Sequence, residues 1–278
     1  MAQEVANTTG GSVPAYLKDY QGATGTENIS REDVTIPRLK IGQGLTAEVK
    51  EGLVKDGDLF VNLGAQVVAL KGAPLDFVPL AYAKEFILWR PREDNGGGIL
   101  ARARPVWDEK EHRVRYKWDK PNTRFDVKLK GLVKVSWETQ EYIDQDGLDQ
   151  WGSENPNDNS SGIAATAHLN YVVALPAFGD MIVAFSFSRT TTKAGKDLNG
   201  LLKQGRVPMF ARLFTAKTFE QKNDKGEFNT VKIMPKGFVP EDAFNFYKGV
   251  SEQFQTGFVV DQSDEASEGS EAGDEGSV

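Results

Sequence analysis

The sequence contains no cysteine and only two histidines, and these shortages exclude or disfavour several kinds of site. Without cysteine the chain forms no disulfide bond and no cysteine-based zinc site. His112 and His168 would need carboxylate partners to hold a metal ion, and the sequence does not identify such partners. We therefore predict that both histidines are surface or packing residues, and we expect no metal and no other cofactor.

Long apolar runs and catalytic motifs are also missing. No run reaches the ~18 apolar residues of a membrane-spanning helix, and no charged start is followed by the apolar stretch of a secretory signal. The segment 194–197 lacks the spacing and the hydroxyl of a phosphate-binding loop, and no nucleophile-elbow or zinc-protease motif occurs. We expect a soluble cytoplasmic protein that is not an enzyme and has no membrane partner.

The net charge of −7 hides a strong segregation of charge along the chain. Residues 261–278 hold seven acids and no base, so residues 1–260 are neutral together. Within these, 84–134 carry 14 Lys and Arg against 8 Asp and Glu, 189–236 carry 11 against 4, and 137–161 carry seven acids and no base. Two basic stretches of this kind indicate a surface for a polyanion, despite the negative total.

From about residue 34 the sequence has the pattern of a β protein, with short runs of Val, Ile, Leu and Phe separated by Gly, Asp and Pro. We predict strands at 36–42, 58–63, 66–71, 75–82, 84–90, 99–106, 113–118 and 181–189, and a hairpin of 206–220 with 228–234. The predicted fold is mainly β, an OB-like Greek-key β-barrel with insertions and a few peripheral helices. We divide the chain into a flexible arm (1–33), a single-stranded DNA-binding domain (34–258) and a disordered acidic tail (259–278).

The clearest pattern is the alternation of apolar and mostly basic residues over 124–138, which predicts one long strand that bends or bulges at Gly131. The acidic segment 139–162 is predicted to be a surface loop or insertion. A helix is favoured over a strand for 163–175, and a loop for 190–200. A further helix is expected to begin at Pro240 and to end at Gly257, with its apolar residues at helical spacing.

Binding of single-stranded DNA requires cations for the phosphates and flat side chains for the bases, and the basic stretches supply both. If neighbouring strands pair, their rows of charge merge into one surface. The candidate DNA-binding residues are Lys84, Trp89, Arg90, Arg92, Arg102, Arg104, Trp107, Arg113, Arg115, Tyr116, Lys117, Lys128, Lys130, Arg189, Lys193 and Lys196.

Each of these signals also has a structural interpretation. Trp118 and Trp137 are predicted to be core residues rather than stacking platforms, and cations on strands also prevent aggregation. The tail acids are Asp261, Asp264, Glu265, Glu268, Glu271, Asp274 and Glu275. They can compete with DNA for the basic surface, dock basic partners, or serve solubility alone.

Three segments carry a family resemblance: 32–43, 87–92 followed by a Gly-rich turn, and 208–220 with 225–228. Through them, and over roughly residues 30–235, the chain resembles tailed-phage single-stranded DNA-binding proteins. The resemblance implies an OB-like fold, a role in phage DNA replication or recombination in the host-cell cytoplasm, and the enzymes of those processes as partners. The chain ends in Gly276-Ser277-Val278 rather than in an aromatic residue, which weakens the case for partner docking through the terminus.

Three functions remain open from the sequence. The first is sequence-tolerant binding of single-stranded DNA, with an acidic tail for autoinhibition or partner docking. The second is a non-catalytic protein-interaction or virion-associated role, and the third is a metal-dependent nuclease that uses acids of 138–158. Self-association is compatible with the first two.

Overall fold

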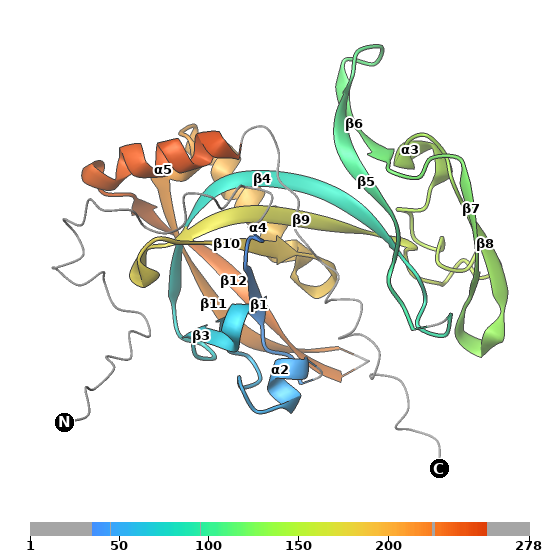
Figure 1. The fold of residues 1–278 in the computed structure, drawn as a ribbon, viewed down its shortest axis with the longest axis horizontal. Helices are drawn as coiled ribbons and strands as arrows, with labels where there is room; N and C mark the ends of the chain where they lie inside the picture. Colours follow the sequence, from blue (N-terminus) through green and yellow to red (C-terminus); the bar gives the residue numbers. More distant parts are fainter. Residues whose placement is uncertain (1–34, 45, 95, 224–225, 255–278) are drawn as a thin grey trace, which may run out of the picture.

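The computed structural model describes residues 35–44, 46–94, 96–223 and 226–254 (Figure 1). The expected arm, the tail acids and Gly257 lie outside the described residues. The strands are β1 (Arg38–Ile41), β2 (Leu59–Val61), β3 (Gln66–Ala69), β4 (Leu75–Trp89), β5 (Ile99–Asp108), β6 (Arg113–Trp118), β7 (Thr123–Lys128), β8 (Lys134–Thr139), β9 (Ala165–Leu175), β10 (Met181–Phe187), β11 (Arg212–Asn223) and β12 (Gly226–Phe238). The α-helices are α2 (Ala47–Lys50), α3 (Ile143–Asp146), α4 (Thr192–Gly205) and α5 (Glu241–Gln253). The prediction of a mainly β fold is confirmed.

Ten of the strands form one curled sheet in the order β12-β11-β4-β9-β10-β1-β2-β3, and β5 and β6 extend it from β4. The first half of β4 pairs with β11, its second half pairs with β5, and β9 lies along its other edge. β7 and β8 form a separate two-stranded sheet. Figure 1 shows β4 and β9 arching from the part beneath α5 to the part built from β5 to β8. This two-stranded arch joins two regions that have separate hydrophobic cores.

The strand β4 replaces the two strands predicted at 75–82 and 84–90. It runs for 15 residues without a break. Pro79 cannot donate a ladder hydrogen bond, and the register with β9 shifts between Pro79 and Ala81. The shift lets the strand continue past the proline. The predicted interruption at Ala83 does not form, because Ala83 pairs with Asn170 of β9.

The first core lies inside the curl and is rich in aromatic residues. Phe77 packs edge-on against Phe185 at 6.0 Å between ring centroids and stacks with Phe214 at 5.9 Å. The two edges of the curl meet through side chains, since Thr218 Oγ1 on β11 donates to the carbonyl of Gly57 at 2.7 Å and accepts from the N–H of Gly72 at 3.1 Å. These bonds hold the sheet as a half-barrel around its core.

The helix α4 occupies the segment 190–200 that the sequence predicted to be a loop, so that prediction is wrong. Gly195 makes the helix possible here, because a Cβ at this position would lie 2.8 Å from side-chain atoms of both Leu169 and Phe187. The glycine lowers helix propensity but allows close packing of α4 on the sheet. Leu198 of the same helix is fully buried in the first core.

The second core lies under β5 to β8 and contains Trp118 and Trp137, which are 2% and 3% exposed. Both tryptophans are core residues, as predicted. The single long strand predicted at 124–138 is wrong, because β7 and β8 form a hairpin whose turn contains Gly131 at φ +74°. Phe125 pairs with Trp137. In this register every odd-numbered residue of β7 pairs with an odd-numbered residue of β8, and every even-numbered residue pairs with an even-numbered one. The alternation therefore continues unbroken through the turn and looks like one strand.

The strand β9 occupies the segment 163–175 for which a helix was favoured, and that prediction is also wrong. β9 lies between β4 and β10 and is buried on both faces from His168 onward. Burial on both faces removes the alternation that identifies a half-exposed strand. The hairpin predicted from 206–220 and 228–234 is confirmed as β11 and β12. The helix predicted to begin at Pro240 is confirmed as α5.

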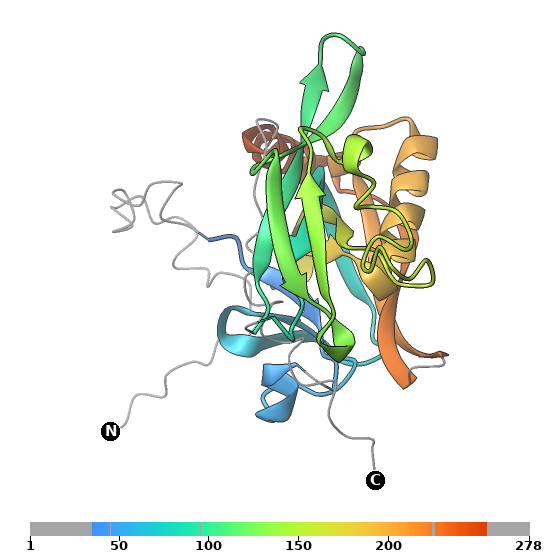
Figure 2. The same cartoon turned by 90° about the vertical axis from the view of Figure 1, so that its right-hand side faces the viewer.

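The two long helices cover opposite faces of the sheet, as Figure 2 shows. α4 packs on the inner face, which is the face inside the curl. α5 packs on the outer face through Tyr247, which contacts a cluster containing Val78 and Leu80 of β4. The outer face thus has an apolar area under α5.

Candidate functional site

The outer face of the sheet carries a row of polar side chains beyond the area that α5 covers. Register places opposite residues of neighbouring strands on the same face, as for Glu85 and His168. The row crosses β1, β10, β9, β4, β5 and β6 and consists of Arg38, Lys40, Ser186, Asn170, His168, Glu85, Arg102, Arg104 and Lys117. We call it the outer polar row.

Glu85 organises the middle of the outer polar row. It is only 5% exposed, and it receives a 2.9 Å hydrogen bond from Asn170 Nδ2. Arg102 Nη1 lies 3.3 Å from each carboxylate oxygen, and Arg104 Nε lies 3.9 Å from Oε2. A buried carboxylate is stable only when it is paired and hydrogen-bonded, and these contacts provide both. Glu85 therefore fixes the positions of two arginines predicted to bind DNA.

His168 lies beside Glu85 on β9 and is fully buried. Burial, together with the charges of Arg189, Arg38 and Arg102, lowers the pKa of His168 to about 3. The imidazole is therefore neutral at pH 7. Within the described part of the chain, neither of its ring nitrogens has a hydrogen-bond partner, and the same holds for Trp89 Nε1 and Ser186 Oγ.

Trp89, Arg92 and Arg189, all predicted DNA-binding residues, come together next to His168. The ring centroids of Trp89 and His168 are 6.0 Å apart, and the Arg189 guanidinium lies 5.9 Å from the Trp89 ring. Arg189 has φ +48°, a left-handed conformation that a non-glycine residue adopts at a cost. Burial lowers the pKa of Arg92, and the charge of Arg189 acts in the same direction.

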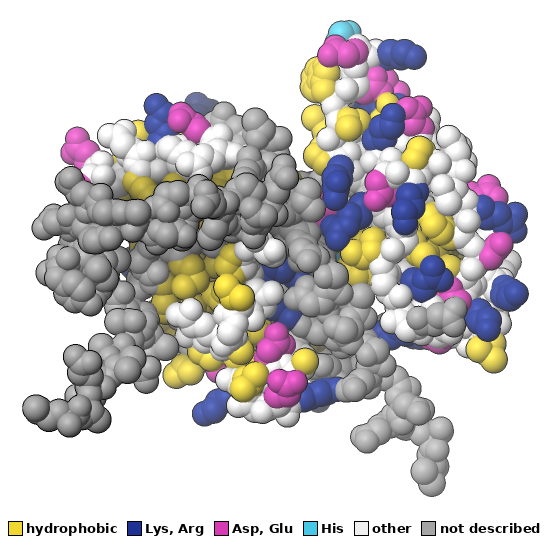
Figure 3. All heavy atoms as spheres, in the orientation of Figure 1, with side chains coloured by type: hydrophobic (Ala, Val, Ile, Leu, Met, Phe, Trp, Pro, Cys, Tyr) yellow, Lys and Arg dark blue, Asp and Glu magenta, His cyan; other side chains and the backbone are white. Residues whose placement is uncertain are grey.

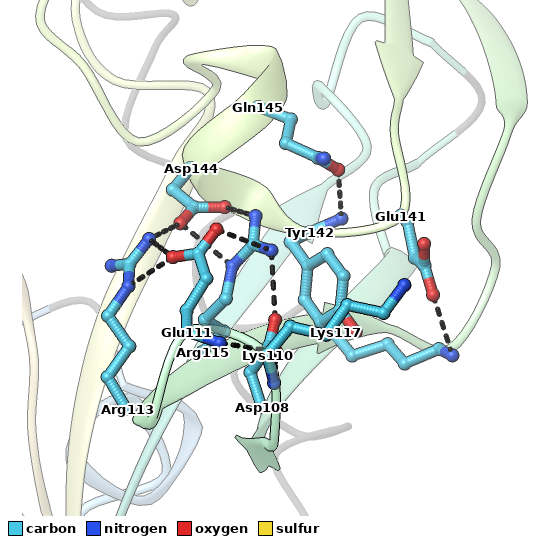
Figure 4. A network of polar contacts seen from close by, with 10 residues as sticks. All are labelled: Asp108, Lys110, Glu111, Arg113, Arg115, Lys117, Glu141, Tyr142, Asp144 and Gln145. Atoms are coloured by element: carbon cyan, nitrogen blue, oxygen red, sulfur yellow. Dashed lines mark hydrogen bonds and ion pairs between the residues drawn. The ribbon is translucent and has the colours of Figure 1, made fainter.

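Arg113 and Arg115 belong instead to an ion-pair network at the far end of the row (Figure 4). Arg115 contacts Asp144 at 2.5 Å and Asp108 at 3.1 Å, and its side chain is only 9% exposed. Arg113 also contacts Asp144, at 2.8 Å. Hydrogen bonds and charge from Arg115 lower the pKa of both Asp108 and Asp144. The acidic segment 137–161 thus supplies a structural counter-ion, and the structure does not present Arg115 to a ligand.

The Arg115→Ala variant is expected to lose thermal stability without losing affinity for phosphates. Removing the guanidinium leaves Asp108 and Asp144 close together without their shared cation. Thermal unfolding should show a clearly lower Tm, and oligonucleotide titrations at several salt concentrations should show an unchanged slope. Arg113→Ala is the matched control, with a smaller fall in Tm because that side chain is 53% exposed. A shallower salt slope for Arg115→Ala would return this residue to the DNA interface.

Lys84, Trp107 and Tyr116 lie on the inner face, opposite the outer polar row. Lys84 Nζ sits 4.3 Å from the Phe86 ring centroid and 5.0 Å from that of Tyr116. Burial lowers the pKa of Lys84. Trp107 is 57% exposed and pairs with Val114 on the projecting β5–β6 hairpin. One strand of DNA cannot contact these residues and the outer polar row at the same point of the sheet.

The remaining predicted residues lie elsewhere. Arg90 pairs with Asp94 at 2.9 Å, and Lys193 pairs with Asp197 at 2.7 Å on α4, which also carries Lys196. Lys128 and Lys130 lie at the tip of the separate β7–β8 hairpin, so their charges do not merge with those of β5 and β6. Figure 3 shows basic and acidic side chains interspersed over the part built from β5 to β8.

The sequence analysis missed Arg38, Lys40, His168 and Ser186 as members of the site. Arg38 and Lys40 alternate with Leu39 in a strand that was predicted, so their position on the polar face was visible in the pattern. His168 was concealed because a helix was favoured for its segment. Ser186 carries no charge, and only the register between β10 and β9 brings it into the row.

No group of three or more His, Asp or Glu side chains within the described part of the chain is arranged to hold a metal ion. The helices of that part are too short or too polar to cross a lipid bilayer.

Residues 6–260 match the family model described as the Pam3 phage gp34-like protein. The chain belongs to this family. It is therefore a bacteriophage protein, in agreement with the phage origin that the resemblance implied. No curated protein and no solved structure matches the chain.

Proposed function

We propose that this phage protein binds single-stranded DNA without sequence preference along the outer polar row. The observation that carries the proposal is the convergence of Arg92, Arg189 and Trp89 on a row of polar side chains that crosses six neighbouring strands. Cations that follow a sheet surface neutralise successive phosphates, and an aromatic ring beside them stacks with a base. Trp89 is the aromatic residue in that position.

A single strand fits this surface better than a duplex. The Arg102 side chain is 13% exposed and that of Glu85 is 7% exposed, so the charged groups in the middle of the row protrude little. A flexible single strand can fit its phosphates and bases to such groups, whereas a stiff duplex contacts only protruding groups. The proposed binding mode is that of OB-like proteins, in which the surface of a curled sheet tracks the strand.

The biological role we propose is protection of exposed strands during phage DNA replication or recombination, in the host-cell cytoplasm and without catalysis. The phage family and the surface chemistry support this role. Enzymes of replication or recombination are the proposed protein partners, and a second copy of the chain is compatible with cooperative binding along the strand.

Fluorescence anisotropy of a labelled oligo-dT, titrated with protein at low and moderate salt, tests this function. We expect saturable binding that weakens as salt rises and is tighter than binding to the matching duplex. Equal binding to the duplex would refute the single-strand preference, and no binding by the full chain or by a chain lacking 261–278 would refute the function.

Removal of residues 261–278 is expected to tighten binding to oligo-dT at low salt. The segment carries seven acids and no base, so its removal takes away an intramolecular competitor for cations. The gain should shrink as salt rises, because salt screens the competition. Anisotropy titrations of the full and shortened chains measure it. Identical affinities at low salt would show that the acidic segment does not compete with DNA.

A non-catalytic protein-interaction or virion-associated role is the alternative proposal. Trp107 and Val114 face each other on the projecting β5–β6 hairpin and are 57% and 50% exposed. An exposed apolar pair on a projecting hairpin is typical of a contact with another protein. This role becomes the leading one if oligo-dT does not bind, and Trp107→Ser should then weaken complexes isolated from infected cells.

A further inference from the structure

In and beside the middle of the outer polar row, several buried polar atoms have no hydrogen-bond partner among the described residues. They are the two ring nitrogens of His168, Trp89 Nε1 and Ser186 Oγ. Leaving a buried polar atom unpaired costs about 1–3 kcal/mol, so such atoms are rare in folded proteins. Several of them in one region indicate a group that binds there.

His168 lies between the other two side chains on the outer face. Trp89 lies against His168, with 6.0 Å between ring centroids. Ser186 is directly opposite Asn170 on the neighbouring strand, which makes it a diagonal neighbour of His168 on the same face. The indole N–H can only donate, and the hydroxyl and the neutral imidazole can each donate one hydrogen bond. An acceptor can therefore satisfy one donor on each of the three side chains.

The charges around this region favour an anionic acceptor. Arg38, Arg102 and Arg189 act electrostatically on His168, and the charge of Arg189 also acts on Arg92. Glu85 is the carboxylate opposite His168, and it is already held by Arg102 and Asn170. Bringing Arg92 and Arg189 together costs electrostatic energy, and an anion between them and His168 offsets that cost.

We propose that Trp89, His168 and Ser186, with Arg92 and Arg189 beside them, form a binding site for one phosphate group. A phosphate has several acceptor oxygens arranged around a tetrahedral centre, so it can accept from three donors that do not share a plane. The proposal rests on the proposed function where it assigns the phosphate to DNA. The same donors would also bind a free phosphate ion.

The test uses the two histidines as reporters in NMR spectra of the full chain labelled with ¹⁵N. His168 belongs to the site, and His112 is exposed on the β5–β6 turn and serves as the internal control. Titration with sodium phosphate at constant ionic strength, with chloride as the balancing ion, should shift the His168 signals saturably and leave those of His112 unchanged. A bound anion favours the imidazolium, so phosphate should also raise the pKa of His168.

Two variants make the result specific. Trp89→Phe keeps the ring but removes the N–H donor, and it should weaken phosphate binding about tenfold. Ser186→Ala is a small change in a half-buried side chain and should weaken binding less. The NMR spectrum of each variant shows whether it is folded. Undiminished affinity in both folded variants would overturn the proposal.

Oligonucleotides distinguish the source of the phosphate and separate this proposal from the proposed function. A shift of His168 by 5′-phosphorylated oligo-dT but not by the 5′-hydroxyl form assigns the site to a strand end, whereas equal shifts assign it to internal phosphates. A phosphate-induced shift without oligo-dT binding supports the site and refutes the DNA-binding function. Oligo-dT binding with no shift of His168 by oligonucleotide or phosphate leaves that function intact and overturns the site.

Discussion

Acidification from pH 7 to pH 5 is expected to destabilise the protein by about 2 kcal/mol through His168 alone. The pKa of this histidine is about 3 in the fold, against 6.5 for the unperturbed group. Above pH 6.5 the residue is neutral in both states and stability does not change. Below pH 6.5 the unfolded chain takes up a proton that the folded chain cannot accept, so the free energy of unfolding falls as pH decreases towards 3.

Urea unfolding followed by tryptophan fluorescence at pH 7 and pH 5 measures this effect. The His168→Asn variant should lose most of the difference between the two pH values, whatever its absolute stability. His112→Asn is the matched control and should keep the difference, because His112 is exposed and asparagine tolerates its positive φ. Equal pH dependence in the wild type and in His168→Asn would show that the buried histidine is not the acid-sensitive group.

The Arg189→Gly variant is expected to bind oligo-dT several-fold more weakly while remaining as stable as the wild type. Glycine relieves the left-handed backbone at φ +48°, and this gain offsets the lost contact with the Trp89 ring. The lost cation should reduce the slope of log affinity against log salt by ~0.7, the value for one phosphate contact on a single strand. Anisotropy at several salt concentrations and thermal unfolding measure the two effects.

Arg206→Gly provides a matched control for this variant. Arg206 is also an arginine with positive φ, at +52°, but it ends α4 on the inner side of the sheet. Its replacement relieves the same strain and removes the same charge away from the outer polar row. Equal losses of affinity in the two variants would mean that general charge, rather than the position of Arg189, determines binding.

Much of the β architecture could be predicted from sequence, because half-buried strands alternate and Gly, Asp and Pro divide them. The failures have identifiable physical causes. In the β7–β8 hairpin, apolar and polar residues alternate without a break through the turn, because odd-numbered residues pair with odd-numbered ones. In β9 this alternation is missing, because both faces of the strand are buried. α4 has three glycines that lower its helix propensity, and Gly195 is required by packing against Phe187. Only the fold supplies these constraints.

The candidate site was predicted in part. Trp89, Arg92, Arg102 and Arg189 were chosen for their charge or ring, and the structure brings them to one face. Charge alone could not distinguish these residues from Arg115, whose guanidinium is bound by Asp144. Asp144 is 29 residues away in the sequence, and only the fold brings it to Arg115. The role of His168 depends on its neighbours on three other strands, and no local pattern encodes that environment.

The central claim is that single-stranded DNA follows the outer polar row, and comparison of two double variants tests it most directly. Arg104→Ala/Lys117→Ala removes two cations of the row whose side chains are 47% and 44% exposed. Lys128→Ala/Lys130→Ala removes two exposed cations from the tip of the β7–β8 hairpin. The measurement is the slope of log affinity for oligo-dT against log salt. We expect the slope to fall by ~1.4 for the first variant, as for two lost phosphate contacts, and to stay unchanged for the second. Equal reductions, or a reduction only in the β7–β8 variant, would contradict the proposed path of the DNA.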